Sequence, residues 1–250
     1  MQILLTISYD GTAYAGWQRQ QNAIAVQQKL EEALSTLLNQ PITTKAASRT
    51  DAGVHALGQR AVFLVENLLL PLDKLPQVLT GYLPHDISIT TAEAVPDSFS
   101  PRFDAAYKTY AYNFYNAQTP NPLKRRYSAF VPRPLDITAM QKAAKHFIGV
   151  HDFTAFQATG SSAKTTTREI YACTICKHPS NLITLTITGN AFLYNMVRII
   201  AGTLLYVGLG KIQADTIPVI IKSKDRTKAG KTMPPEGLTL LEVGYTNYMP

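Results

Sequence analysis

Two periods of hydrophobic residues alternate along this chain, and their order restricts its fold more than any other feature. Apolar residues at every second position indicate strands, and apolar residues three and four apart indicate helices. In the amino-terminal part these patterns predict strands over 3–9, 43–47, 59–65 and 87–95 and helices over 25–39 and 73–81. Strand, helix, strand, strand, helix, strand is the order of a split βαβ, or ferredoxin-like, unit.

The same order of elements returns in the carboxy-terminal part. The patterns there predict strands over 107–115, 170–177, 182–188 and 239–245 and helices over 136–148 and 191–207. No sequence identity between the two parts is evident, so the repeat is one of architecture. We therefore predict an α+β protein with two ferredoxin-like, RRM-like halves, residues 1–104 and 105–250. Their sheets are expected to join into one continuous, mostly antiparallel sheet, with helices on one face and a basic groove on the other.

The most apolar stretch, residues 189–210, carries a single charge, Arg198. Its length of about twenty residues raises a membrane helix as an alternative. Arg198, Asn190 and Asn195 would be costly in lipid, whereas Asn190 is a good N-cap for a buried helix that ends near Gly208. A buried guanidinium must find an anion, and a structural ion pair with Glu242 or Asp104 is one way to supply it.

Composition indicates a folded protein with a polyanionic partner. The chain has 24 Lys and Arg against 17 Asp and Glu, which gives a net charge of +7, and 46% of its residues are hydrophobic. Nucleic acid is the first candidate for such a basic protein. Cys173 and Cys176 are too few for a disulfide scaffold or a four-cysteine zinc site, and we expect them to pack in a strand. The amino terminus has no basic, apolar leader pattern, so we expect a cytoplasmic protein with no membrane segment.

The segment 48–59 places one carboxylate, Asp51, between Arg49 and His55 in a turn of small residues. Gly53 can adopt positive φ at little cost, so the turn can hold Asp51 outward, where a substrate can approach it. An exposed, oriented carboxylate of this kind can act as a nucleophile. The simpler interpretation is a local Asx turn beside a solvated Arg49.

Aromatic and basic residues that could meet RNA lie in the second half. On the strand over 107–115, Lys108, Tyr110, Tyr112 and Phe114 share one face, which suits either core packing or base stacking. Core packing is favoured for Tyr112 and Phe114. A basic stretch over 222–231 could meet phosphates or be a solvated surface. Further candidate RNA-binding cations are Lys124, Arg125, Arg126, Lys164 and Arg168.

Five segments together resemble the tRNA pseudouridine synthase A family. The Arg-Thr-Asp-Ala-Gly-Val-His core of residues 49–55 resembles the motif of its catalytic aspartate, and segments 108–112 and 191–198 resemble its second and third motifs. The segments 9–18 and 224–238 are similar to the family's opening and to its carboxy-terminal signature. Ser48 departs from the glycine that the family commonly has there, which leaves Arg49, Thr50 and Asp51 in place. The resemblance covers nearly the whole chain.

The resemblance implies the pseudouridine synthase fold and a function. It implies a homodimer that isomerises uridine to pseudouridine at positions 38, 39 and 40 of the tRNA anticodon stem-loop, without metal or organic cofactor. Asp51 would be the nucleophile, Arg198 its ion-pair partner, and Tyr110 would lie against the flipped uracil. Attack on the base, attack on C1′ and a glycal route all remain open for Asp51. Substrate contacts are expected from Arg49, Thr50, His55 and Tyr110.

Three other functions compete with this one. A non-catalytic RNA-binding protein could be built from two RRM-like sheets, but the aromatic RNP1 pattern is absent and Asp51 would repel phosphates. A metal-dependent nuclease would need several clustered acids instead of one Asp with an Arg partner. A related enzyme acting on different uridines is the third alternative.

Overall fold

The computed structural model describes residues 1–161 and 163–246, which divide into two compact units. Unit 1 comprises Met1–Ala106 and Thr239–Thr246, and unit 2 comprises Tyr107–Leu238. The division after Ala106 lies close to the boundary expected from the sequence. The last strand, which the sequence places in the second half, belongs to unit 1 in the structure.

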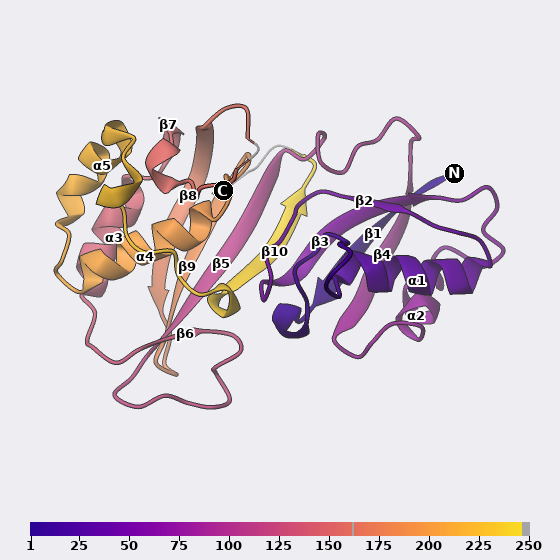
Figure 1. The fold of residues 1–250 in the computed structure, drawn as a ribbon, viewed down its shortest axis with the longest axis horizontal. Coiled ribbons are helices and arrows are strands. Elements are labelled where there is room, and N and C mark those ends of the chain that lie inside the picture. The colour runs from indigo at the N-terminus through magenta and orange to yellow at the C-terminus, as the bar shows by residue number, and fades with distance from the viewer. Residues whose placement is uncertain (162, 247–250) are drawn as a thin grey trace. The chain divides into compact units, whose positions relative to one another are not determined.

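From β1 to β4, unit 1 has the element order that the sequence predicts, and β10 is added to it. Its elements are β1 (Gln2–Tyr9), α1 (Val26–Leu38), β2 (Thr44–Ala46), β3 (His55–Leu64), α2 (Leu75–Thr80), β4 (Ile87–Val95) and β10 (Leu238–Gly244). The strand order is β4, β1, β3, β10, with β2 also paired to β3. All these pairs are antiparallel except β10 with β3, which is parallel. The prediction of a mostly antiparallel α+β fold is therefore confirmed (Figure 1).

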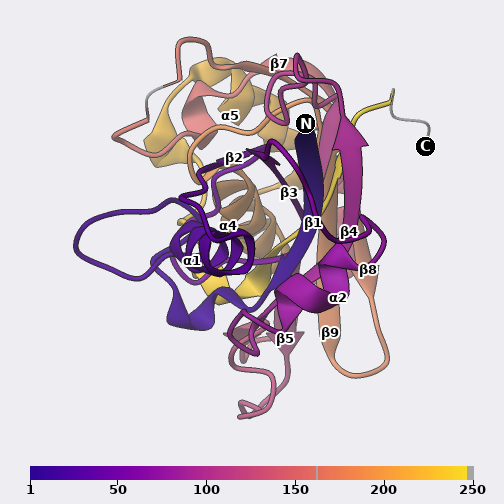
Figure 2. The ribbon, with the colours of Figure 1, turned by 90° about the vertical axis from the view of Figure 1, so that its right-hand side faces the viewer.

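The core of unit 1 follows from two periodicities. Ile3, Leu5 and Ile7 point to one face of β1 and are completely buried, because successive side chains of a strand alternate between its faces. Leu30 and Leu34 lie four residues apart on α1 and are also completely buried. Figure 2 shows α1 on one side of the strands. Helix α2 contacts both α1 and β4.

Unit 2 has its own antiparallel sheet, with strand order β5, β9, β8, β7 and with β6 parallel to β5. Its elements are β5 (Tyr107–Asn116), β6 (Ala129–Val131), α3 (Ile137–Lys145), β7 (Gly149–Asp152), β8 (Thr167–Lys177), β9 (Leu182–Gly189), α4 (Met196–Gly208) and α5 (Ile217–Ser223). Helices α3 and α4 pack together, and α3 contacts β8. Both cysteines lie on β8. Cys173 packs there as expected, and burial raises its pKa to about 12, whereas Cys176 is exposed. The joining of the two sheets stays a prediction.

The apolar segment forms the buried helix α4, but the helix starts later than expected. It begins at Met196, after Asn195 in a left-handed conformation with φ of 60°. Asn190 is not its N-cap, because its side-chain oxygen accepts a hydrogen bond from the Glu169 N–H (3.1 Å). Ile199, Ile200, Ala201 and Leu204 are completely buried by protein, whereas Arg198 is half-buried. Over residues 1–161 and 163–246, no helix has the length and apolar character that crossing a membrane requires.

The stretch that follows α5 packs tightly against α4. The buried Gly230 N–H donates a hydrogen bond to the Thr203 hydroxyl (2.8 Å). Gly202 lies so close to the Lys231 carbonyl that a Cβ on it would sit 1.8 Å from that oxygen. Arg226 donates to the Gly230 carbonyl (2.8 Å) and so closes the stretch on itself. The basic stretch was expected either to meet phosphates or to be solvated. Part of it is instead held in place by contacts within the protein.

Candidate active site

Asp51 lies in the turn that leads from β2 into β3. The Val54 N–H donates to the Asp51 carbonyl (3.1 Å), and the Gly53 N–H donates to the Tyr14 carbonyl (3.3 Å). Gly53 has φ of 77°, which confirms the expected positive φ. Asp51 itself is half-buried. The turn thus presents a carboxylate on a backbone with defined hydrogen bonds.

The segment after β1 fixes this turn from the other side. The Trp17 N–H donates to the Thr50 carbonyl (3.1 Å), and the indole of Trp17 is buried. Gly16 has φ of 91°, and a Cβ on it would lie 2.5 Å from the Thr50 oxygen. The Thr50 hydroxyl shares a buried hydrogen bond with the Tyr9 hydroxyl (2.7 Å). The backbone beside Asp51 therefore has little room to move.

His55 and Thr50 support the turn from inside. His55 is 4% exposed, its Nδ1 accepts a hydrogen bond from the Gly11 N–H (3.1 Å), and Asp10 Oδ1 lies 3.1 Å from the same nitrogen. Arg49, by contrast, is exposed. Arg49 is thus exposed, whereas Thr50 and His55 are buried, and the expected contacts of these residues with a substrate stay a prediction.

Tyr110 lies on β5 in unit 2, opposite Ile187 of β9. It is 7% exposed, and its ring meets the ring of Phe192 edge to face, with centroids 5.2 Å apart. Tyr112 and Phe114 on the same strand are completely buried, which confirms their expected place in the core. Tyr110 is therefore oriented by an aromatic neighbour on the segment just before α4.

Arg198 lies in the first turn of α4 and is held by two hydrogen bonds within unit 2. Its Nε donates to the Met233 carbonyl (2.7 Å), and its Nη1 donates to Asn195 Oδ1 (2.6 Å). The Met233 N–H returns a bond to the Arg198 carbonyl (3.2 Å). Because two different guanidinium nitrogens donate these bonds, the plane of the guanidinium is fixed. Asp104, one suggested partner, accepts a local bond from the Ser100 N–H (2.9 Å).

The motifs thus fall into both units. Arg49, Thr50, Asp51 and His55 share one turn of unit 1, while Tyr110 and Arg198 belong to unit 2. The ion pair between Asp51 and Arg198 stays a prediction. Among the residues that the structure describes, three or more His, Cys, Asp or Glu side chains nowhere gather as they would to hold a metal ion.

The candidate RNA-binding cations differ in their surroundings. Arg125, Arg126 and Lys164 are exposed, and Lys124 is half-buried. Arg168 donates to the Thr167 carbonyl (2.6 Å), and burial lowers the pKa of its guanidinium. The exposed three are thus the more accessible to phosphates.

Known proteins resemble this chain over nearly its whole length. A family model described as tRNA pseudouridine synthase matches residues 5–104 and 143–246. The tRNA pseudouridine synthase A of Ruminiclostridium cellulolyticum is 48% identical over 244 residues, which are 98% of this chain and 99% of that protein. The protein of the same name from Caldicellulosiruptor bescii is 49% identical over 243 residues, or 97% of this chain and 99% of that one.

A solved structure described as an H/ACA RNP bound to a substrate RNA containing 2′-deoxyuridine also matches, with a TM-score of 0.42 and 12% identity over 96% of this chain and 47% of that chain. The family model and the curated relatives confirm the resemblance seen in the sequence. The chain belongs to the tRNA pseudouridine synthase family, a family of isomerases.

Proposed function

We propose that the protein isomerises uridine to pseudouridine at positions 38, 39 and 40 of the tRNA anticodon stem-loop. The observation that carries this proposal is the Asp51 turn. It holds one half-buried carboxylate on a fixed backbone, beside an exposed arginine, in a chain of this family. A carboxylate that must meet a nucleotide at close range needs this combination of access and rigidity.

The reaction moves the uracil without adding or losing atoms. The N1–C1′ bond breaks, a C5–C1′ bond forms, the proton on C5 leaves, and N1 gains a proton. Asp51 can drive it by attacking C1′, by attacking the base, or by removing a ribose proton in a glycal route. All three routes need Asp51 to be ionised at the start.

Arg198 would keep Asp51 ionised and oriented. A guanidinium beside a carboxylate favours the charged form of the acid, and its planar fork fixes the direction of the hydrogen bonds. The bonds from Arg198 to Met233 and Asn195 support this role, because they fix the orientation of the guanidinium. In this proposal the nucleophile and its partner come from different units.

Tyr110 would lie against the uracil once the nucleotide has left the stacked stem. Its ring is already held edge to face by Phe192, so little side-chain entropy would be lost when the base binds. Its hydroxyl is the candidate for handling the C5 proton. Base flipping costs a few kcal/mol. Arg49, which is exposed, would fill the space left in the stem or hold the flipped phosphate.

Recognition of three adjacent positions favours binding through the shape of the RNA backbone. We propose that a homodimer in the cytoplasm provides the surface, with Lys124, Arg125, Arg126, Lys164 and Arg168 as phosphate contacts. One tRNA would then lie across both subunits. Light scattering should give twice the chain mass of 27.5 kDa. An isolated anticodon stem-loop should bind more weakly than whole tRNA, and a monomer that binds both equally would contradict the cross-subunit arrangement.

The function is tested by mapping pseudouridine in tRNA from cells that have the protein, lack it, or carry Asp51→Ala. We expect modification at positions 38 to 40 to disappear in the last two strains. The purified variant should bind tRNA within a few-fold of the wild type, because the carboxylate performs chemistry and its charge opposes binding. Persistent modification at all three positions in the strain without the protein would refute the specificity. Measurable turnover by Asp51→Ala would refute the nucleophile.

A further inference from the structure

An exposed polar loop leads into α1, and no role has yet been assigned to it. Residues 18–22 are all exposed and consist of three glutamines, one asparagine and Arg19. Such a run has no apolar side chain to bury, so packing does not explain its composition. Amides and guanidinium groups are donors suited to phosphate oxygens and ribose hydroxyls.

This loop is closed and attached to the Asp51 turn. Its ends are joined by hydrogen bonds from the Ala15 N–H to the Ile24 carbonyl (2.9 Å) and from the Val26 N–H to the Gly16 carbonyl (3.2 Å). Arg19 is only two residues beyond Trp17, whose N–H binds the Thr50 carbonyl. Two residues span at most about 7 Å, so the backbone of Arg19 lies close to the residues that support Asp51.

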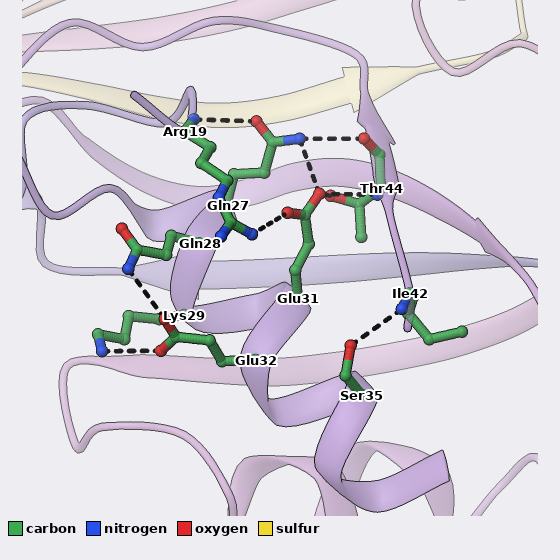
Figure 3. A network of polar contacts seen from close by, with 9 residues as sticks. All are labelled: Arg19, Gln27, Gln28, Lys29, Glu31, Glu32, Ser35, Ile42 and Thr44. Atoms are coloured by element: carbon green, nitrogen blue, oxygen red, sulfur yellow. Dashed lines mark hydrogen bonds and ion pairs between the residues drawn. The ribbon is translucent and has the colours of Figure 1, made fainter. Parts of the chain in front are cut away.

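Arg19 is anchored at one end and open at the other. Its Nη1 lies 3.2 Å from Glu31 Oε2, and the side chains of Arg19 and Glu31 are 57% and 6% exposed. Its backbone N–H donates to Gln27 Oε1 (3.1 Å). Figure 3 shows the Arg19 side chain reaching from the loop to the Glu31 carboxylate on α1. A guanidinium has five N–H donors, so one contact to Glu31 leaves donors for a second anion.

The buried Glu31 carboxylate is stabilised as a fixed anchor. Its Oε1 accepts hydrogen bonds from the Thr44 N–H (2.9 Å), the Gln27 amide (3.0 Å) and the Thr44 hydroxyl (3.2 Å). Gln27 also donates to the Thr44 carbonyl (3.1 Å). These bonds offset the cost of burying a charge. They also join the loop, α1 and β2, the strand that leads to the Asp51 turn (Figure 3).

A second ion pair on α1 provides a contrast. Lys29 and Glu32 lie 2.8 Å apart, three residues from each other, with side chains 30% and 47% exposed. Such a pair is solvated on both sides and contributes little. In the Arg19–Glu31 pair, by contrast, the acid is buried and the base is exposed. Holding a long side chain in place before binding removes part of the entropy cost of immobilising it on a ligand.

We propose that residues 18–22 form an RNA-backbone contact surface, in which Arg19, held by Glu31, binds a phosphate of the tRNA next to the Asp51 turn. This inference rests on the proposed function for the identity of the RNA. The planar guanidinium can hold a phosphate with two parallel hydrogen bonds, which a flexible lysine cannot do. The glutamine and asparagine amides next to it would contact ribose hydroxyls and the neighbouring phosphate.

The test measures the affinity of whole unmodified tRNA by fluorescence anisotropy over a series of KCl concentrations. Arg19→Gln should weaken binding about tenfold, the effect of losing a charge-assisted hydrogen bond. It should also reduce the slope of log K against log salt by about one, the signature of one lost phosphate contact. Arg19→Lys should keep the slope and recover only part of the affinity.

Glu31→Gln and Glu32→Gln form a matched pair, because each removes one negative charge from α1. Charge alone predicts that both bind the polyanion slightly more tightly. We expect this for Glu32→Gln only. Glu31→Gln should bind about threefold more weakly, because Arg19 loses its charged anchor. Equal behaviour of the two variants would overturn the anchoring role of Glu31.

Wild-type affinity and salt slope in Arg19→Gln would overturn the proposal as a whole. Thermal unfolding of each variant shows whether it is folded. If Glu31→Gln does not fold, the Arg19 variants still test the phosphate contact. Failure of this loop proposal can be distinguished from failure of the proposed function. Normal modification at positions 38 to 40 together with an unchanged slope refutes only the loop. Lost affinity in Arg19→Gln, in a protein that does not modify those positions, refutes only the proposed function.

Discussion

Replacing Gly202 by alanine should destabilise unit 2, although alanine is the better helix former. Gly202 lies inside α4, where the exchange for alanine would by itself gain about 1 kcal/mol. The new Cβ, however, would sit 1.8 Å from the Lys231 carbonyl oxygen. The chain at Lys231 would have to retreat by roughly 1.5 Å to restore ordinary contact. Backbone cannot rotate out of the way as the end of a side chain can.

The retreat has two costs. Strain from overpacking a dense interior is typically about 1–3 kcal/mol. Displacement also breaks the hydrogen bond from the Gly230 N–H to the Thr203 hydroxyl, and leaving the buried Gly230 N–H unsatisfied costs about 1–3 kcal/mol. After subtraction of the gain in helix propensity, we expect a net loss of about 3 kcal/mol. Domain stabilities are about 5–15 kcal/mol, so the effect is measurable.

Gly208, the last residue of the same helix, provides the control. A Cβ there would meet Met140 Sδ at 2.7 Å, and this flexible side chain can adjust. Gly208→Ala should change the free energy of unfolding by less than about 1 kcal/mol. Urea unfolding followed by circular dichroism measures both variants. Turnover should fall more in Gly202→Ala, because the displaced stretch also carries the carbonyl that binds Arg198. A Gly202→Ala protein as stable as the wild type would refute the reasoning.

Three further predictions concern single side chains. Tyr110→Phe keeps the ring against Phe192 and should bind tRNA normally but turn over slowly in a pseudouridine-formation assay; near-normal turnover would reduce Tyr110 to a stacking residue. Arg198→Lys should lose most of its activity with tRNA affinity retained, because one ammonium cannot replace the planar fork, and a value near that of the wild type would contradict its role. Lys224 Nζ lies 2.8 Å from Asp152 Oδ2, and this hydrogen bond is the main cause that lowers the pKa of Asp152. The ionised acid therefore adds stability above its unfolded pKa of about 3.9. That contribution is lost as the pH falls through the lower folded pKa. Asp152→Asn should therefore be less stable than the wild type at neutral pH and approach it in acid, as followed by thermal unfolding; a gap that does not change with pH would contradict this.

Long periodic patterns predicted the main elements because their side chains carry the information. The apolar face of α1 and the alternation in β1 each consist of many residues. One residue that departs from the pattern therefore does not change the predicted element. The strands β6 and β7 have three and four residues, too short for any period to show, and they exist because of distant partners. The start of α4 was misjudged because two asparagines were available as caps. In the structure the Asn190 side-chain oxygen accepts a hydrogen bond from the Glu169 N–H, and the helix begins after Asn195.

The candidate site was visible in the sequence where it consists of charged side chains. Asp51 stood out because Arg49, His55 and small residues surround it in one motif, and Arg198 stood out because an apolar helix is an unusual place for a charge. Two backbone contacts were missed: the Met233 carbonyl that binds Arg198, and the close approach of Gly16 to Thr50. Backbone atoms are the same in nearly every residue, so the residue type does not indicate such contacts. The anchor at Glu31 was missed for a different reason. An acid at one position of a helix full of polar residues gives no sign of being buried.

Strand β10 belongs to unit 1 but is translated last, so unit 1 can be completed only late in biosynthesis. Thr239 and Leu240 pair with His55 and Ala56 at the start of β3, directly after the Asp51 turn. Gly58 allows this strand to come close, since a Cβ there would lie 2.4 Å from the Leu241 oxygen. About three quarters of the chain separates the two pairing partners in sequence. A nascent chain can therefore form β1, β3 and β4 early, while the strand beside the Asp51 turn is still to be translated. Completion of this half of the protein waits until unit 2 has left the ribosome.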